Sequence, residues 1–201
     1  IPPDSIEIAS DSKYRYLDYT MPLGDPWFNG TSWVDLFNPK MIDKFIDCSY
    51  KPYTDRYAKD AGTDVFGIFT DEPQISPRVV SFPELGRVAW SPYLQTRFKK
   101  DHGYDIADHL ASLFEEVGDY KKIRLHFYRS VGNAFEESFS KRIGEYCAEN
   151  NFVWTGHYNG ENSFQSVIAN VGNLMIQYRH MQRPGVDWLG LSIAGGITAL
   201  K

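Results

Sequence analysis

The sequence predicts an α/β protein with a parallel sheet, and three observations lead to this class. Helical patterns alternate with short apolar runs in the order helix, strand, helix, strand, helix, strand. The apolar runs are continuous rather than alternating, which is typical of strands buried on both faces. Such an order produces parallel strands joined by right-handed crossovers. It fits either a doubly wound sheet or an eight-stranded (β/α)8 barrel.

The chain opens with an irregular segment before its first helix. Residues 1–37 are rich in Tyr, Trp, Asp, Pro and Gly, and we expect short strands and loops there. Asn38 suits a helix N-cap and Pro39 suits the first helical position, whereas Pro52 should break or kink the helix. We expect a single domain, in which residues 38–201 form β/α units.

The first predicted strand is the run Val-Phe-Gly-Ile-Phe-Thr, which ends at Thr70 and leads into Asp71 and Glu72. A proline-rich loop follows it over residues 73–90. Short helices are then expected from Ser91 to about Lys100 and over the sequence Asp-Ile-Ala-Asp-His-Leu-Ala-Ser-Leu-Phe. A long helical insertion therefore separates the strand that ends at Glu72 from the next one.

The clearest helix spans residues 122–150. Along it, apolar residues recur every four positions and predict a buried stripe: Ile123, Phe127, Val131, Phe135, Phe139, Ile143 and Cys147. This helix leads to a second buried strand, Phe-Val-Trp-Thr-Gly-His, which ends at His157. A weaker helix over residues 166–181 and a third strand within residues 185–195 complete the pattern. We expect Cys48, like Cys147, to be a buried thiol outside any disulfide.

The number of strands bounds the size of the sheet. With a possible strand near Trp33–Leu36, the sequence contains three or four strands in 201 residues, whereas a full barrel usually needs about 250 residues. No glycine-rich phosphate-binding fingerprint follows a strand, which disfavours a nucleotide-binding doubly wound sheet. If the fold is a barrel, the chain therefore contains about half of it.

Composition excludes several classes of function. The net charge is -5 and no run of Lys or Arg exceeds two residues, so we expect no nucleic-acid partner. No apolar run approaches the roughly 18 residues of a membrane span. The chain begins at Ile1 without a signal-peptide pattern, which fits a processed or excised chain. We favour a secreted or periplasmic protein over a cytoplasmic one.

Polar side chains gather where the predicted strands end. In parallel α/β folds, functional residues lie at the carboxyl ends of the strands. The three strand ends and the loops after them supply carboxylates, an imidazole and an indole: Asp71, Glu72, His157, Glu161, Asp187 and Trp188. Each one alone has an ordinary interpretation, such as a turn cap, a hydrogen-bonded histidine or a loop carboxylate. Their convergence on one rim favours a functional site.

Two carboxylates at neighbouring strand ends suit the cleavage of a glycosidic bond. One must donate a proton to the leaving oxygen, and the other must activate water or attack the sugar. Neighbouring strands lie roughly 4.8 Å apart, so Glu72 and Glu161 could reach either the retaining or the inverting separation.

Two other functions remain open at this stage. His157, Glu161, Asp71 and Asp187 could bind a divalent ion, where zinc would require more His or Cys and oxygen ligands point to calcium. A metal-dependent hydrolase of another class would use such a site. A non-catalytic carbohydrate-binding or scaffold protein would instead rely on aromatic side chains, which are Trp27, Trp33, Trp154 and Trp188.

Five motifs occur here in one order: "WVDLFNP", "GIFTDEP", "SPYLQTRFKKDHGYDIADHLASLF", "TGHYNGEN" and "RPGVDWLG". Together, over roughly residues 33–201, they resemble the catalytic barrel of the α-L-rhamnosidase glycoside hydrolases (family 106) and their uncharacterised relatives. The resemblance implies a partial (β/α)8 TIM barrel, about half of the barrel, within a larger multidomain protein. It also implies inverting hydrolysis and an active-site calcium.

The resemblance also implies roles for individual residues. By its motif "FTDEP", Glu72 resembles the general acid of the family. By its motif "TGHYNGEN", Glu161 resembles a carboxylate of the same site. The resemblance leaves the base as either Glu161 or a residue of later strands. Asp71, His157, Asp187 and Trp188 are expected to bind substrate or shape the site; calcium ligands are not assigned. The expected activity is glycoside hydrolysis by a carboxylate acid/base pair, in its narrowest form an α-L-rhamnosidase-like exo-enzyme acting on polysaccharide side chains.

Overall fold

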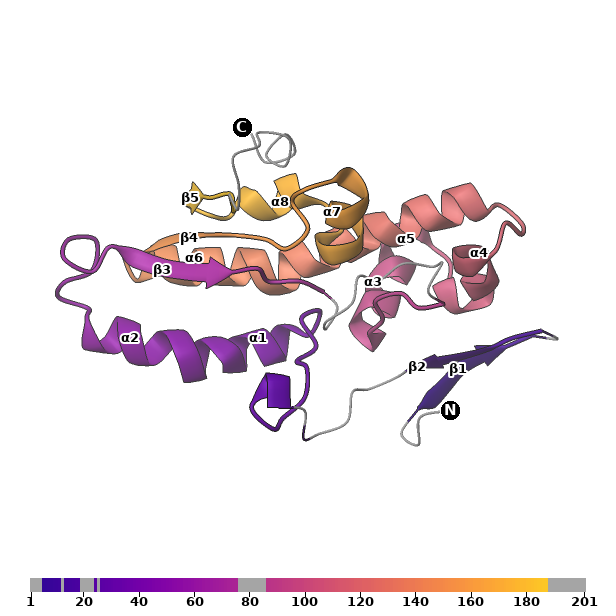
Figure 1. Cartoon of the computed structure of the whole chain (residues 1–201), viewed down its shortest axis with the longest axis horizontal. Coiled ribbons are helices and arrows are strands. Elements are labelled where there is room, and N and C mark those ends of the chain that lie inside the picture. The colour runs from indigo at the N-terminus through magenta and orange to yellow at the C-terminus, as the bar shows by residue number, and fades with distance from the viewer. Residues whose placement is uncertain (1–4, 12, 19–23, 25, 76–85, 188–201) are drawn as a thin grey trace.

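The computed structural model describes residues 5–11, 13–18, 24, 26–75 and 86–187. Its centre is a parallel sheet of strands β3 (Gly67–Asp71), β4 (Val153–His157) and β5 (Arg183–Pro184), in that spatial order (Figure 1). The predicted α/β class and the parallel pairing are confirmed. Closure of this sheet into a barrel stays a prediction.

The register of the sheet brings the ends of β3 and β4 to the same level. Asp71 pairs with His157, and Thr70 pairs with Gly156. Gly156 has φ 140°, and a Cβ there would lie 2.0 Å from the carbonyl oxygen of Thr70, so only glycine allows this approach. The two strands therefore release their following loops side by side.

A long helical crossover joins β3 to β4, as predicted. It consists of α3 (Pro92–His102), η4 (Ile106–His109), α4 (Leu110–Phe114), α5 (Tyr120–Phe135), η5 (Glu136–Ser140) and α6 (Lys141–Glu149). The hydroxyl of Ser91 caps α3 by accepting from the Tyr93 amide, and Gly103 ends it at φ 78°. In Figure 1, α6 runs along β4 while α3 and α4 lie beside α5.

The buried stripe of this crossover is confirmed, and its spacing explains a π-helical turn. All seven residues from Ile123 to Cys147 that recur every four positions are at most 5% exposed. Residues four apart drift by about 40° around a straight α-helix, so the stripe would wind off one face. The π-helical turn η5 inserts an extra residue and turns the stripe back toward the core. Burial also raises the pKa of the Cys147 thiol to about 12, which excludes it as a nucleophile at neutral pH.

The first helix is interrupted as expected, but by a different device. Helix α1 (Pro39–Phe45) passes through the π-helical turn η2 (Ile46–Tyr50) into α2 (Lys51–Arg56), so the interruption lies just before Pro52. Its buried side consists of Ile42, Ile46 and Tyr50. Cys48 points away from the core and is exposed, so the expectation of a buried thiol was wrong there.

Two predicted strands differ from the structure. Trp33–Leu36 forms no strand. The third strand is the short β5 at Arg183–Pro184, which lies before the predicted range of 185–195. The part of that range from residue 188 onward lies outside the described residues.

The remaining elements lie before β3 and between β4 and β5. At the start of the chain, β1 (Ile6–Ser10) and β2 (Arg15–Asp18) form an antiparallel hairpin, followed by η1 (Pro26–Phe28). Between β4 and β5, Gly172 separates α7 (Phe164–Val171) from α8 (Leu174–Tyr178). No described helix is long and apolar enough to cross a membrane.

Successive residues of β3 point to opposite faces, and only one face is packed. On the packed face, the Thr70 hydroxyl lies 2.9 Å from the Tyr50 hydroxyl and accepts from the indole nitrogen of Trp154 at 2.7 Å. On the other face, Phe69 is 61% exposed. The prediction that β3 is covered on both faces was therefore wrong, because its apolar run includes residues of the open face.

Candidate functional site

The backbone at the end of β3 holds Glu72 in an unusual conformation. Its φ is 47°, and the other described non-glycine residues with positive φ are Asn29 and Asn151, a residue type that tolerates this region. A left-handed glutamate costs about 1–2 kcal/mol. Its side chain is exposed, and within the described ranges no hydrogen bond or ion pair reaches its carboxylate. Strain and exposure together make Glu72 available to a ligand.

His157, at the end of β4, is buried at 7% exposure and oriented by Asp71. Its Nε2 lies 3.0 Å from Oδ1 of Asp71, and its ring packs edge-on against Phe69 at 5.9 Å between centroids. Nδ1 is buried and has no hydrogen-bond partner among the described residues. If a single ring proton sits on Nε2, beside the Asp71 carboxylate, Nδ1 presents a lone pair.

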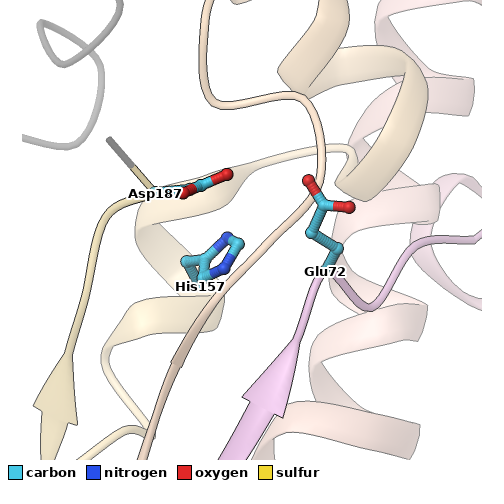
Figure 2. A group of neighbouring side chains, drawn as sticks. All are labelled: Glu72, His157 and Asp187. Atoms are coloured by element: carbon cyan, nitrogen blue, oxygen red, sulfur yellow. The ribbon is translucent and has the colours of Figure 1, made fainter. Parts of the chain in front are cut away.

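Asp187 follows β5 and completes the group. One oxygen of Glu72, one oxygen of Asp187 and one nitrogen of His157 all lie within 4.8 Å of one another. Figure 2 shows both carboxylates beside the His157 ring, on three chain segments that run side by side. The structure thus brings together four of the six predicted site residues: Asp71, Glu72, His157 and Asp187.

Glu161 lies in a different environment from these residues. It is 7% exposed, and its carboxylate accepts hydrogen bonds from the Tyr178 hydroxyl, from the Asp187 amide at 3.1 Å and from the Tyr158 amide at 3.4 Å. The Tyr178 hydroxyl also lies 2.9 Å from the carbonyl oxygen of Gly185. Burial, and then the contact with Glu161, raise the pKa of Tyr178, so it stays a donor. Glu161 thereby ties the loop after β4 to the segment that carries Asp187.

A group of buried polar side chains supports the loop after β4, and the sequence alone did not predict this group. The Ser140 hydroxyl lies 2.8 Å from the Tyr158 hydroxyl and donates to Oε1 of Gln177 at 2.6 Å. Gln177 in turn donates to the carbonyl oxygen of Gly132 at 3.0 Å. Ser140 belongs to the π-helical turn η5, so this turn anchors Tyr158, whose ring packs edge-on against Tyr178. The sequence signal for this layer was the polar residues Ser140 and Gln177 at helix positions that are buried.

The remaining predicted residues are aromatic. Trp188 lies outside the described residues. Trp154 is fully buried on the packed face of the sheet, where it cannot stack on a sugar, and Trp33 is half-buried. Trp154 therefore does not contribute to a sugar-stacking platform, and the side chain of Trp27 lies outside the described part of the structure.

The donor set does not fit the calcium that the resemblance implies. Calcium takes six to eight oxygen ligands, whereas this group offers two carboxylates and one imidazole nitrogen. Glu161, the nearby additional carboxylate, is engaged by donors of the protein itself. This group is therefore not assigned to calcium.

Comparison with known proteins supports the fold. A rhamnosidase from Novosphingobium sp. PP1Y has a similar structure, with a TM-score of 0.56 and 15% sequence identity over 75% of this chain. The match covers 14% of the rhamnosidase, so this chain spans only a small part of that protein's length. No protein-family model and no curated protein matches the sequence. The similarity shows that this chain shares its fold with part of that structure.

Proposed function

We propose that the protein to which this chain belongs hydrolyses a glycosidic bond, and that Glu72 protonates the leaving oxygen. The observation that carries this proposal is Glu72 at the carboxyl end of β3, which is strained, exposed and without a hydrogen-bond or ion-pair partner among the described residues. Strained backbone persists where the surrounding structure imposes it, and such residues cluster at active sites. The fold shared with a rhamnosidase supports a glycoside as the substrate.

His157 and Asp71 would bind the sugar next to the acid. With the ring proton on Nε2, beside Asp71, Nδ1 of His157 would accept a hydrogen bond from a sugar hydroxyl. A buried acceptor without a partner is costly, so a substrate hydroxyl at this position would gain affinity. Asp187, exposed and within 4.8 Å of a nitrogen of His157, can accept from a second hydroxyl.

The second carboxylate of the reaction is not Asp187 if the reaction inverts. Its nearest oxygen lies within 4.8 Å of one oxygen of Glu72, whereas an inverting pair needs about 6.5–9.5 Å to admit water. Glu161 keeps its lone pairs engaged by three donors, which suits a positioning role better than activation of water. We therefore propose that the inverting base lies outside the described residues, and we keep Glu161 as the alternative. In its narrowest form, the proposal takes an α-L-rhamnoside as the substrate, which the similarity to a rhamnosidase structure supports.

Leaving groups of different basicity test the role of Glu72. In the whole protein, Glu72→Gln should lower kcat/KM by about 10²–10⁴-fold on an alkyl or phenyl glycoside, because those leaving groups need a proton. The same variant should lose little on a 2,4-dinitrophenyl glycoside, whose leaving group departs as the anion. Glu116→Gln, an exposed carboxylate away from the strand ends, is the matched control and should behave as wild type. Equal losses on both substrates, or no loss on either, would exclude Glu72 as the acid.

A further inference from the structure

We propose that Glu72, Nδ1 of His157 and Asp187 form a binding site for zinc, and that an ion bound there inhibits the hydrolase. Three acceptors meet within 4.8 Å, one of them a nitrogen, and they come from the ends of three neighbouring strands. No Lys or Arg in the described part of the chain forms an ion pair with either carboxylate. Two carboxylates at this distance repel each other, and a cation between them removes the repulsion.

The buried nitrogen of His157 is an independent indication of a ligand. Within the described part of the chain Nδ1 has no hydrogen-bond partner, although the residue is only 7% exposed, and buried polar atoms are normally hydrogen-bonded. Protein metal sites commonly hold a histidine by one nitrogen while the other donates to a carboxylate. Asp71 already occupies that second position, at 3.0 Å from Nε2. A proton on Nε2, beside this carboxylate, would leave Nδ1 as the metal-binding atom.

The ligand types decide between ions. Zinc accepts imidazole and carboxylate ligands, and sites with three protein ligands leave a fourth position for water or another small ligand. The group has this composition, with one nitrogen and two carboxylates. Ligands of a tetrahedral zinc lie closer together than 4.8 Å, so the exposed side chains of Glu72 and Asp187 would rotate inward around the fixed His157. A calcium ion would find too few oxygen atoms.

Inhibition follows from the shared residue, and this part rests on the proposed function. A carboxylate that ligates a metal cannot at the same time donate a proton to a leaving oxygen. Zinc and substrate would also compete for Nδ1 of His157. Zinc should therefore lower kcat/KM of the whole protein, and a chelator should restore it.

Calorimetry on the chelator-treated whole protein tests the site without reference to activity. We expect zinc to bind at this site with one ion per chain. Glu72→Gln and Asp187→Asn, both at exposed positions, should weaken binding or abolish it, and Asp71→Asn should weaken it by about 10–100-fold. His180→Gln is the matched control, because His180 also faces a carboxylate, Glu136 at 2.8 Å, but lies outside this group. That variant should bind zinc as the wild type does.

Several results would overturn the zinc site. They are the absence of binding at millimolar zinc, equal affinity in Glu72→Gln and wild type, or tighter binding of calcium than of zinc. The two proposals fail separately. Zinc binding that depends on Glu72, in a protein without glycosidase activity, would overturn the proposed function and support the metal site. Glycosidase activity that follows the leaving-group pattern, in a protein that binds no zinc, would support the proposed function and overturn the metal site.

Discussion

Glu72 and Glu161 follow neighbouring strands, yet the fold treats them in opposite ways. Glu72 is exposed, has a strained backbone and makes no hydrogen bond or ion pair with any described residue. Glu161 is buried and accepts from two backbone amides and a tyrosine hydroxyl. Glu72 is therefore accessible to a ligand and has a strained backbone, whereas Glu161 contributes stability and positions Asp187.

The largest expected effect tests the buried member of the pair. Glu161→Ala leaves the amides of Asp187 and Tyr158 without their acceptor, and each unsatisfied buried donor costs about 1–3 kcal/mol. We expect the free energy of unfolding, measured with urea, to fall by about 3 kcal/mol. Glu72→Ala should change it by less than about 0.5 kcal/mol, as an exposed substitution does. Equal losses of unfolding free energy in the two variants would show that Glu161 stabilises the fold no more than Glu72 does.

An intermediate effect is expected for the tyrosine that holds Glu161. Tyr178→Phe removes one donor from the carboxylate and keeps the ring in the core, so unfolding should become easier by about 1–2 kcal/mol. Combined with Glu161→Ala, the loss should be smaller than the sum of the two, because both changes break the same network. Additive losses would show that Tyr178 acts independently of Glu161.

The smallest effect concerns the strain at Glu72. Glycine adopts positive φ freely, so Glu72→Gly should be more stable than Glu72→Ala by about 1 kcal/mol, although both lose the carboxylate. Asn29→Gly, at the similar φ of 52°, should gain less over wild type than Glu72→Gly, because asparagine tolerates this conformation. The measurement is again urea unfolding. A glycine variant no more stable than the alanine variant would show that Glu72 stores no strain.

Much of this arrangement could be predicted from local patterns. The apolar stripe from Ile123 to Cys147, the cap at Ser91 and the stop at Gly103 all lie where sequence periodicity and turn chemistry place them. The convergence of Asp71, Glu72, His157 and Asp187 followed from one rule, that parallel strands end at the same edge of a sheet.

Other features depended on partners remote in the sequence. Trp33–Leu36 has strand-like composition but forms no strand, and the third strand begins at Arg183, where it pairs with β4. The four-residue spacing of the stripe is present in the sequence. The π-helical turn that keeps this stripe facing the core could be recognised only in the folded helix.

The sequence by itself determined which chemical groups reach the strand ends, because a strand's direction and the alternation of its side chains are local properties. Tertiary structure alone decided what each group does there. Glu161 turns inward because Tyr178 and the Asp187 amide, 17 and 26 residues away, offer it donors, whereas Glu72 finds none in the described part of the chain. Burial and hydrogen bonding are set by such distant contacts, and they separate a carboxylate that supports the fold from one that can act on a substrate.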